Sequence, residues 1–383
     1  MKIVFYSIVL NHHQAYVADE FYNMLGDEYC FVELIRCLDM KGATEDYSKR
    51  PYLLKAWESV ESYRRAMTLA CEADVCVFAG YEALIFERER LKLNKLSFDM
   101  GERMLKRGIL NLLSPRILKL FLAYHVNRWK NRPLYKLSCS AYTCVDSYKL
   151  GMFKSKHYKW GYFTNVDSDF EVEVLQKGVS AVKKTHSLMW CARFLKLKHP
   201  ELPIKMASRL KIKGYNFILD MYGSGVELEK MKQLAKSLDV EDVVNFKGDR
   251  PNNEILKAMR QHEIFLFTSD KNEGWGAVTN ESMSNGCVIV ASDAIGSVPF
   301  LVKDRWNGCI FKSCDLDSLY SMVVWLLDNP IERKQLAINA YQTMRDVWSP
   351  KCAAENFLQL VDELQSGKDL TIKDGPCSKA ETI

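Results

Sequence analysis

The sequence predicts an α/β protein made of two doubly wound domains, each with a parallel sheet covered by helices. Its 383 residues exceed what one ordinary hydrophobic core serves, which favours two domains. Short apolar runs alternate with helical patterns throughout, as is typical of parallel sheets. A polar, poorly periodic stretch at residues 164–184 predicts a linker between an N-terminal domain (1–163) and a C-terminal domain (185–349).

The N-terminal domain contains five short apolar runs that we interpret as strands. They are Ile3–Leu10, Cys30–Ile35, Val75–Ala79, Lys95–Asp99 and Ser140–Val145. The first run is too short for a secretory signal and lacks a small-residue cleavage site, so it predicts a buried strand. A helical pattern spans Ala56–Ala70, between the second and third strands.

The C-terminal domain shows a more regular alternation. Strands are expected at Ser187–Cys191, Phe217–Tyr222, Val243–Phe246, Ile264–Thr268 and Cys287–Ala291. The helices between them are expected near Pro200–Lys211, Val226–Leu238 and Asn253–Gln261, with a short one ending near Gly286. Three helical segments follow Asp315, the last at about residues 350–366. The tail, residues 367–383, has no periodicity and is expected to be disordered.

The composition excludes several classes of protein. No run approaches the ~20 apolar residues of a membrane-spanning helix, so we expect a cytoplasmic protein. The 12 cysteines include no CxxC pair, which disfavours a metal or disulfide framework. Several lie in apolar runs and are expected to be reduced and buried: Cys76, Cys139, Cys144, Cys191 and Cys287.

The segment SDKNEGWGAVTNE, residues 269–281, has the residue types of a ligand site. It joins a predicted strand to a helix, and ligands of such sheets bind beyond the carboxyl ends of the strands. Gly274 and Gly276 let the backbone approach a ligand closely and expose N–H groups beside a helix N-terminus. The carboxylates of Glu273 and Glu281, eight residues apart, can accept hydrogen bonds from vicinal hydroxyls on different parts of one extended ligand.

The order of the motifs resembles the retaining GT-B glycosyltransferases of family 4. Over residues 187–327 these motifs are WCARFLKLK, MYGSG, VNFKGD, FLFTSDKNEGWG and ASDAIGSVPFLV, including a Glu-x7-Glu pair. The resemblance implies a GT-B fold: two Rossmann-like domains whose parallel sheets face a central cleft, with the last helix crossing back to the N-terminal domain. It also implies that a sugar moves from a nucleotide-sugar, UDP- or GDP-linked, to an acceptor hydroxyl with retention.

The resemblance assigns roles to the two glutamates. The first Glu of the family's pair contacts the donor sugar and the second binds the nucleotide ribose, which gives these roles to Glu273 and Glu281. Gly274, Trp275 and Gly276 follow the first glutamate and are expected to line the donor site.

An Arg–Lys pair of the family corresponds to Arg193 and Lys198, after the predicted strand Ser187–Cys191. Such cations stabilise the leaving diphosphate without a metal, so no cofactor or metal is expected. The family usually has Gly after the Lys, where this chain has His199, and Lys196 is the alternative to Lys198.

Two further strand ends carry weaker signals. The motif Gly223-Ser-Gly225 lacks the third glycine of a nicotinamide-binding fingerprint. Two interpretations of it stay open: a tight turn near the donor and a purely structural turn. Residues 247–250, KGDR, follow another strand and weakly indicate a place near the nucleobase. Asp167 and Asp169 resemble a metal-binding pair of another glycosyltransferase fold, but they lie in the polar linker and we assign them no metal.

The acceptor side is expected in the N-terminal domain. Polar side chains follow its first strand: Asn11, His12, His13 and Gln14. Adjacent histidines rarely ligate one ion, so hydrogen bonding in the cleft and a structural role both stay open. Glu102 and Arg103 follow the strand Lys95–Asp99, where contact with an acceptor and helix capping stay equally open.

Residues 103–145 contain nine Lys/Arg, no Asp or Glu, and many interspersed leucines. A basic amphipathic helix of this kind is typical of segments that lie on anionic membranes. We therefore expect peripheral membrane contact, on the cytoplasmic face, and a saccharide or lipid-linked acceptor in cell-surface polysaccharide or glycolipid synthesis. A packed helix with a solvated basic face is the alternative. No nucleic-acid module accompanies the charges, so no nucleic-acid partner is expected.

Two other functions remain as alternatives. One is a catalytically silent, membrane-associated binding protein that keeps the GT-B fold. The other is a GT-B nucleotide-sugar epimerase, which would require its own carboxylates and histidines in place of the Glu-x7-Glu pattern. A phosphorylase of the glycogen type would be much longer and carry a pyridoxal lysine.

Overall fold

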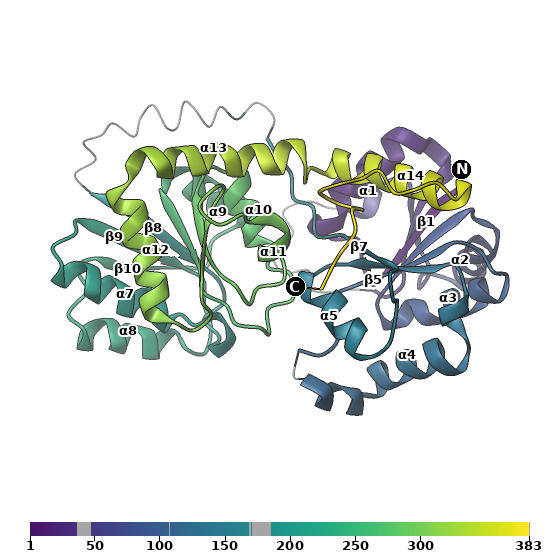
Figure 1. Cartoon of the computed structure of the whole chain (residues 1–383), viewed down its shortest axis with the longest axis horizontal. Coiled ribbons are helices and arrows are strands. Elements are labelled where there is room, and N and C mark those ends of the chain that lie inside the picture. The colour runs from purple at the N-terminus through teal and green to yellow at the C-terminus, as the bar shows by residue number, and fades with distance from the viewer. Residues whose placement is uncertain (37–46, 107, 168–169, 171–184, 383) are drawn as a thin grey trace. The chain divides into compact units, whose positions relative to one another are not determined.

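The computed structural model describes residues 1–36, 47–106, 108–167, 170 and 185–382. The chain forms two compact units: residues 1–165 together with 347–383, and residues 166–346. Each contains one parallel sheet with helices packed on it (Figure 1). The stretch predicted as a linker, residues 164–184, lies largely outside the described residues.

The N-terminal unit is built on a seven-stranded sheet in the order β3-β2-β1-β4-β5-β6-β7. Every pair of neighbouring strands is parallel. The strands are β1 (Ile3–Ser7), β2 (Tyr29–Glu33), β3 (Leu53–Lys55), β4 (Val75–Ala79), β5 (Ser97–Gly101), β6 (Leu134–Ser138) and β7 (His157–Lys159). Their central members, β1 and β4, are buried at every position, because helices cover both faces of the sheet.

One helix of the N-terminal unit comes from the far end of the chain. The helices are α1 (His12–Leu25), α2 (Val60–Glu72), α3 (Leu84–Lys92), α4 (Pro115–Val126), α5 (Ala141–Lys149) and α14 (Pro350–Ser366). Helix α14 lies beside α1 (Figure 1). Its Phe357 ring is 5.1 Å from the ring of Phe98 and 5.5 Å from that of Phe21. Residues 347–383 therefore complete the core of the unit in which the chain began.

Two expectations for this unit are wrong. The run Ser140–Val145 is helical, because the Ser140 hydroxyl accepts a hydrogen bond from the Tyr142 N–H and caps α5. The tail is ordered in its described part, since Cys377 is fully buried. The Cys377 N–H donates to the Lys159 carbonyl (2.7 Å), and the Lys159 N–H donates to the Ser378 carbonyl (2.8 Å), so the tail pairs with the edge strand β7.

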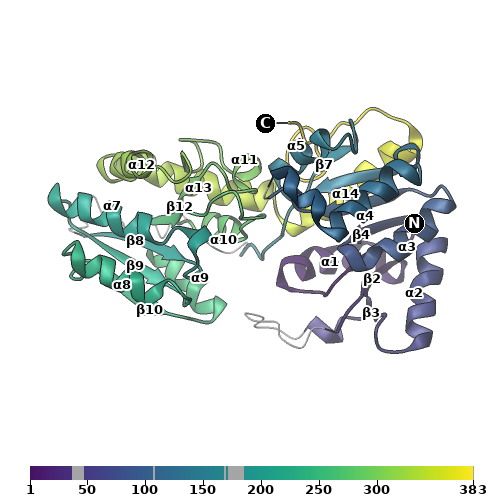
Figure 2. The same cartoon turned by 90° about the horizontal axis from the view of Figure 1, so that it is seen from below.

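The C-terminal unit contains a six-stranded parallel sheet in the order β10-β9-β8-β11-β12-β13. Its strands are β8 (His186–Cys191), β9 (Phe217–Tyr222), β10 (Val244–Gly248), β11 (Ile264–Phe267), β12 (Val288–Ser292) and β13 (Cys309–Phe311). Its helices are α7 (Glu201–Ile212), α8 (Leu228–Ser237), α9 (Asn252–Gln261), α10 (Val278–Ser284), α11 (Val298–Leu301), α12 (Leu316–Asp328) and α13 (Pro330–Asp346). Helices α7 and α8 lie side by side (Figure 2). The elements predicted here from apolar runs are all present, with ends shifted by one or two residues.

The basic stretch at residues 103–145 is not one helix. It contains a short 3-10 segment (Gly108–Leu113), α4, β6 and the first turns of α5. Among the described residues, no helix combines the length and apolarity that crossing a membrane requires. The described cysteines are all free thiols.

Candidate active site

The candidate site lies where the strand order of the C-terminal unit reverses. Strand β8 is flanked by β9 on one side and β11 on the other, and the chain leaves each of the three strands at the same sheet edge. Ligands of open α/β sheets bind at such a reversal. Residues 192–200 follow β8 and residues 268–277 follow β11, and both segments carry side chains that the sequence singled out.

Two hydrogen bonds hold these two segments together, and a third joins the second segment to β8. The Trp190 indole N–H donates to the Thr268 hydroxyl oxygen (3.0 Å), and the Thr268 hydroxyl donates to the Lys198 carbonyl (2.7 Å). The Asp270 N–H donates to the Leu197 carbonyl (2.9 Å). The backbone that carries Lys198 is thereby fixed against the turn that carries Glu273.

Lys198 and Glu273 form an ion pair, which brings together two of the predicted residues. Each side chain is only 15% exposed. Partial exclusion from water strengthens the interaction of both charges with each other and with a charged ligand. The Glu273 N–H also donates to the Asp270 carbonyl (3.0 Å), so the position of this carboxylate is set by a local turn.

The segment with Arg193 is held by the turn after β9. Gly223 (φ +121°) and Gly225 (φ +149°) pack so closely on it that an added Cβ would lie 2.1 Å from the Ala192 carbonyl oxygen and 2.5 Å from that of Phe194. Only glycine permits this approach. The packing of this turn thus requires both glycines. The turn borders the segment that carries Arg193, which is exposed.

The Glu273 turn is anchored by Trp275. This residue is 1% exposed, and its indole N–H donates to the side-chain amide oxygen (Oδ1) of Asn280 (2.9 Å). The Trp275 ring packs inside the unit and so anchors the turn that is expected to line the donor site. Gly274 is buried as well. A Cβ at Gly276 (φ +83°) would lie 2.5 Å from the Phe267 ring, so this position requires glycine.

Glu281, on α10, is a buried carboxyl group. Only 8% of the residue is exposed, and burial raises its pKa to about 7, although a hydrogen bond with Asn252 of α9 acts in the opposite direction. A carboxylate that has lost its hydration is stabilised by hydroxyl donors. The Glu281 carboxylate is thus suited to accept hydrogen bonds from the hydroxyl groups of a ligand.

On the N-terminal unit, Asn11 and the two histidines start α1. The Asn11 side chain accepts a hydrogen bond from the His13 N–H (3.0 Å) and is the helix N-cap. Burial, and secondarily the neighbouring His12, lowers the pKa of His13 to about 3, so this imidazole is neutral at pH 7. Within the described part of the chain, no group of three or more His, Cys, Asp or Glu side chains is arranged to hold a metal ion.

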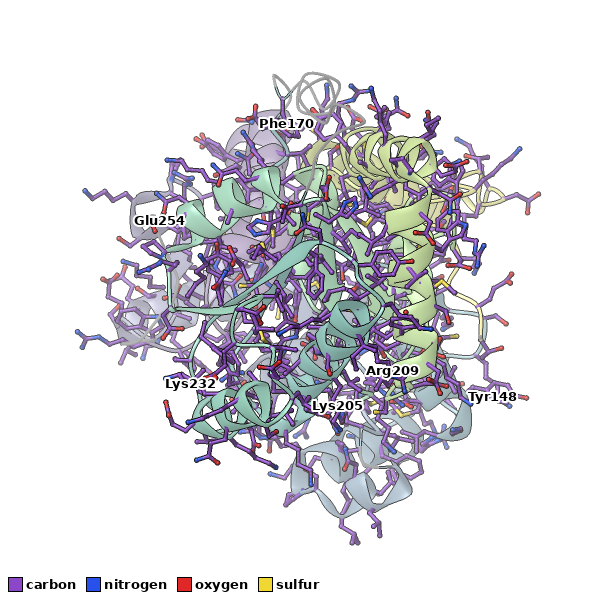
Figure 3. All side chains as sticks on the ribbon, turned by 90° about the vertical axis from the view of Figure 1, so that its left-hand side faces the viewer. Tyr148, Phe170, Lys205, Arg209, Lys232 and Glu254 are labelled. Carbon is purple, nitrogen blue, oxygen red and sulfur yellow. The ribbon has the colours of Figure 1, made fainter. Side chains whose placement is uncertain are left out.

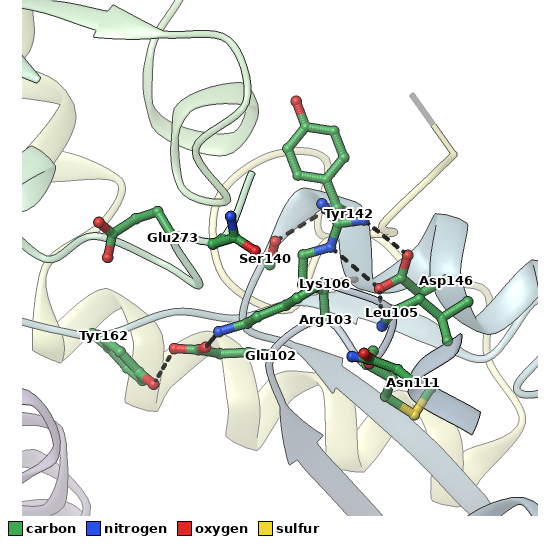
Figure 4. Close-up of polar contacts among 12 residues, drawn as sticks. Glu102, Arg103, Leu105, Lys106, Asn111, Ser140, Tyr142, Asp146, Tyr162 and Glu273 are labelled. Atoms are coloured by element: carbon green, nitrogen blue, oxygen red, sulfur yellow. Dashed lines mark hydrogen bonds and ion pairs between the residues drawn. The ribbon is translucent and has the colours of Figure 1, made fainter. Parts of the chain in front are cut away.

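Glu102 and Arg103 have different surroundings (Figure 4). The Tyr162 hydroxyl donates to one Glu102 oxygen (2.7 Å) and the Lys106 ammonium to the other (2.8 Å). The Tyr162 ring stacks on His13 with a centroid distance of 5.3 Å. These contacts form a polar group, His13–Tyr162–Glu102–Lys106, that the sequence did not predict. Glu102 and Lys106 are close in the sequence, whereas Tyr162 lies 60 residues from Glu102.

Arg103 is a structural residue. Its guanidinium donates two hydrogen bonds to the Asp146 carboxylate, of which the shorter is 3.1 Å, and that carboxylate also accepts the Leu105 N–H (2.8 Å). The Arg103 side chain is 13% exposed and that of Asp146 1%. The sequence left contact with an acceptor and helix capping equally open for Arg103; the structure places its guanidinium on the Asp146 carboxylate.

The residues that carried the weaker sequence signals form ordinary ion pairs near the surface. Asp167 pairs with Arg260 (3.0 Å), while Asp169 lies outside the described residues. Lys247 pairs with Asp220 (3.3 Å).

Residues 174–343, less than half of the chain, match the family described as "Glycosyl transferases group 1". A poly(glycerol-phosphate) alpha-glucosyltransferase of Bacillus subtilis is 26% identical over 148 residues, which is 38% of this chain and 21% of that protein. An uncharacterized glycosyltransferase of Haemophilus influenzae is 28% identical over 41% of this chain and 44% of its own length. A lipopolysaccharide core biosynthesis glycosyltransferase of Rhizobium meliloti is 28% identical over 38% of this chain and 42% of its own length. The matches thus span less than half the length of these relatives.

Solved structures are similar over nearly the whole chain. Anabaena HepE in complex with UDP has a TM-score of 0.70 at 15% identity and covers 96% of this chain and 100% of its own. The apo form of the lipopolysaccharide outer core galactosyltransferase WaaB has a TM-score of 0.70 at 14% identity, with coverages of 96% and 99%. This likeness shows the fold, which is GT-B with two Rossmann-like domains.

Proposed function

We propose that this chain is a retaining GT-B glycosyltransferase of family 4, which moves a sugar from a nucleotide-sugar to an acceptor hydroxyl. The observation that carries the proposal is the half-buried Lys198–Glu273 pair, at the point where the strand order reverses in the C-terminal unit. The pair lies within the segment that matches glycosyl transferases group 1.

In this proposal the two glutamates hold the two sugars of the donor. Glu281 accepts hydrogen bonds from the ribose hydroxyls, since its carboxyl is buried and its pKa is raised to about 7 by that burial. Glu273 contacts the transferred sugar and is presented by a rigid turn anchored at Trp275. The glycines of the turn admit the backbone close to the ligand.

The cations stabilise the departing diphosphate. When the bond between the anomeric carbon and the diphosphate oxygen breaks, Arg193 and Lys198 face the negative charge that develops, so the proposal requires no metal. The acceptor oxygen bonds to the anomeric carbon on the face that the diphosphate leaves, and the diphosphate takes the acceptor proton. The ion pair with Glu273 orients Lys198.

A UDP-linked sugar is the favoured donor, with a GDP-linked sugar as the alternative. Support comes from HepE, of similar fold, whose structures contain UDP and UDP-glucose. Relatives in lipopolysaccharide core synthesis support a saccharide acceptor in cell-surface polysaccharide or glycolipid synthesis. In the N-terminal unit, the Glu102 carboxylate and the Tyr162 hydroxyl are the groups we propose to bind the acceptor's hydroxyls.

A lipid-linked acceptor is supported by the surface of α4 and the 3-10 segment before it. Five apolar side chains there are from 44% to 80% exposed: Leu110, Leu113, Leu118, Leu122 and Val126. The last three repeat at i, i+4 and i+8 and so share one face of α4. Exposed cations flank them, namely Arg116, Lys119, Arg128 and Lys130. We propose that this face lies on an anionic membrane at its cytoplasmic side, because leucines enter the headgroup region and the cations meet the lipid charge.

The test is a panel of UDP- and GDP-sugars assayed for donor hydrolysis and for transfer to saccharide acceptors. Turnover that Glu273→Ala abolishes supports the proposal. Nucleotide binding without turnover on any pair would favour a silent binding protein, and conversion of the donor sugar without an acceptor would favour an epimerase. Sedimentation with anionic vesicles tests the α4 face: Leu118→Ser with Leu122→Ser should abolish pelleting, and salt-insensitive binding would contradict the membrane proposal.

A further inference from the structure

His199 occupies an unusual position directly after Lys198. Its backbone has φ +48°, a left-handed conformation that residues other than glycine adopt with strain. The residue separates the Lys198 segment from α7. None of the chemistry described above uses its imidazole.

Both ring nitrogens of His199 face a carboxylate. Nδ1 lies 2.8 Å from Oε1 of Glu201, at the start of α7, and Nε2 lies 3.4 Å from Oδ2 of Asp270. Only a doubly protonated imidazole donates in both directions. The hydrogen bond with Glu201 raises the pKa of His199 above its ordinary value; burial opposes this shift, and Asp270 adds to it.

Asp270 connects His199 to the turn of Glu273. Its Oδ1 atom accepts hydrogen bonds from the main-chain N–H of Asn272 (2.8 Å) and from the Asn272 side-chain amide (2.9 Å). Its carbonyl accepts the Glu273 N–H (3.0 Å), and its own N–H donates to the Leu197 carbonyl (2.9 Å). The Asp270 carboxylate therefore fixes the turn from one side while His199 faces it from the other.

We propose that His199 is a positioning residue of the donor site: its imidazolium bridges Glu201 and Asp270 and so holds the Lys198 segment and the Glu273 turn in one geometry. The inference rests on the proposed function and adds to it a dependence on pH. When His199 loses a proton, its ring no longer pairs with both carboxylates, and the Glu273 turn becomes less constrained.

Other groups also face this imidazole. The Cys314 thiol lies 3.5 Å from Nε2. A hollow of about 690 Å³, bordered by α8, is lined by His199 and Glu201 and also by two lysines, Lys196 and Lys205 (Lys205 is labelled in Figure 3). The ammonium groups disfavour the imidazolium, whereas the two carboxylates, which lie nearer and pair with the ring directly, favour it.

The test compares the wild-type chain with His199→Gly, His199→Gln and His186→Gln between pH 5.5 and 9. Glycine suits the left-handed backbone, so His199→Gly is expected to fold. His186 provides the matched control, because it also pairs with a carboxylate (Glu263, 3.1 Å) but lies at the opposite end of β8. Hydrogen exchange of residues 269–273 is measured alongside kcat/KM for the donor.

For wild-type protein and His186→Gln, we expect high protection of residues 269–273 at pH 6 and a fall in this protection as the pH rises. His199→Gly should remove the pH step in protection and should lower kcat/KM roughly tenfold relative to wild type when both are measured at pH 6. His199→Gln should retain part of the protection without the step. Equal protection in wild type and His199→Gly at every pH would overturn the inference even in a chain without turnover, whereas absence of turnover in the wild type refutes only the proposed function.

Discussion

Replacing Glu281 with Gln changes a buried carboxyl into a neutral group of nearly the same shape. Glu281 lies on α10 with 8% of its surface exposed. Its pKa is raised from the ordinary 4.5 to about 7, chiefly because burial disfavours the charged form. The substitution should therefore have opposite effects on stability and on ligand binding, because the charge that destabilises the folded chain is the one we propose to hold the ribose.

The size of the effect on stability follows from the shift in pKa. The folded chain binds this proton more tightly than the unfolded chain, so the stabilising contribution is complete below pH 4.5 and is lost as the pH rises to about 7. At about 1.4 kcal/mol per pKa unit, the shift corresponds to about 3 kcal/mol. At pH 8, Glu281→Gln should raise the free energy of unfolding of the C-terminal unit by about this amount. At pH 4 the difference should vanish, because both forms are then neutral.

Two measurements test the prediction. Urea unfolding at pH 4, 6 and 8 gives the stability difference, and calorimetric titration with UDP gives the affinity. The variant should bind UDP roughly 10- to 100-fold more weakly at pH 8, since it loses hydrogen bonds to a charged group. Wild-type affinity should also decrease as the pH falls below about 7, where the carboxyl becomes protonated. Glu254→Gln is the control, because Glu254 is exposed on α9 (Figure 3), and it should change neither quantity.

Two results would refute the reasoning. A Glu281→Gln protein that is no more stable than wild type at pH 8 would mean that burial does not destabilise the carboxylate. Unchanged UDP affinity would remove Glu281 from the ribose site, even if the stability difference is found.

Three other predictions concern residues near the proposed donor and acceptor sites. Arg193→Ala should lower turnover by about 100-fold and leave the melting temperature unchanged, because its side chain is exposed; an unaltered rate would separate Arg193 from the diphosphate. Gly223→Ala should destabilise the C-terminal unit in thermal unfolding, since the new Cβ would lie 2.1 Å from the Ala192 carbonyl oxygen; wild-type stability would contradict the close packing. Arg103→Ala should cost about 3–5 kcal/mol in denaturant unfolding because it leaves the Asp146 carboxylate buried without its cation, and a loss of activity at full stability would instead favour an acceptor role.

The C-terminal unit was largely predictable because its central strands β11 and β12 are buried on both faces. The runs Ile264–Phe267 and Val288–Ala291 are apolar along their whole length and are bounded by polar turns, so their limits are visible in the sequence. The residues after β8 and β11 were predictable as neighbours because parallel strands end at a common edge of the sheet. The Lys198–Glu273 pair follows from that topology.

The failures have physical causes that a local pattern does not contain. The run Ser140–Val145 has strand-like side chains, but the Ser140 hydroxyl caps a helix, and six residues are too few for periodicity to distinguish the two structures. The tail is ordered by main-chain hydrogen bonds to β7, which depend on no side-chain period. The burial of the Trp275 ring inside the unit could not be read from the glycines that flank it in the sequence.

The N-terminal unit is assembled from two stretches that are far apart in the sequence, and this affects the order in which the chain is made. The ribosome synthesises residues 166–346, the whole C-terminal unit, before it synthesises α14 and the residues that pair with β7. During that interval Phe98 and Phe21 lack the Phe357 ring that covers them in the finished protein. The unit that contains residues 1–165 is therefore completed only after residues 166–346 have been made. Until then part of its apolar core is exposed, and chaperones bind exposed apolar surface of this kind in a nascent chain.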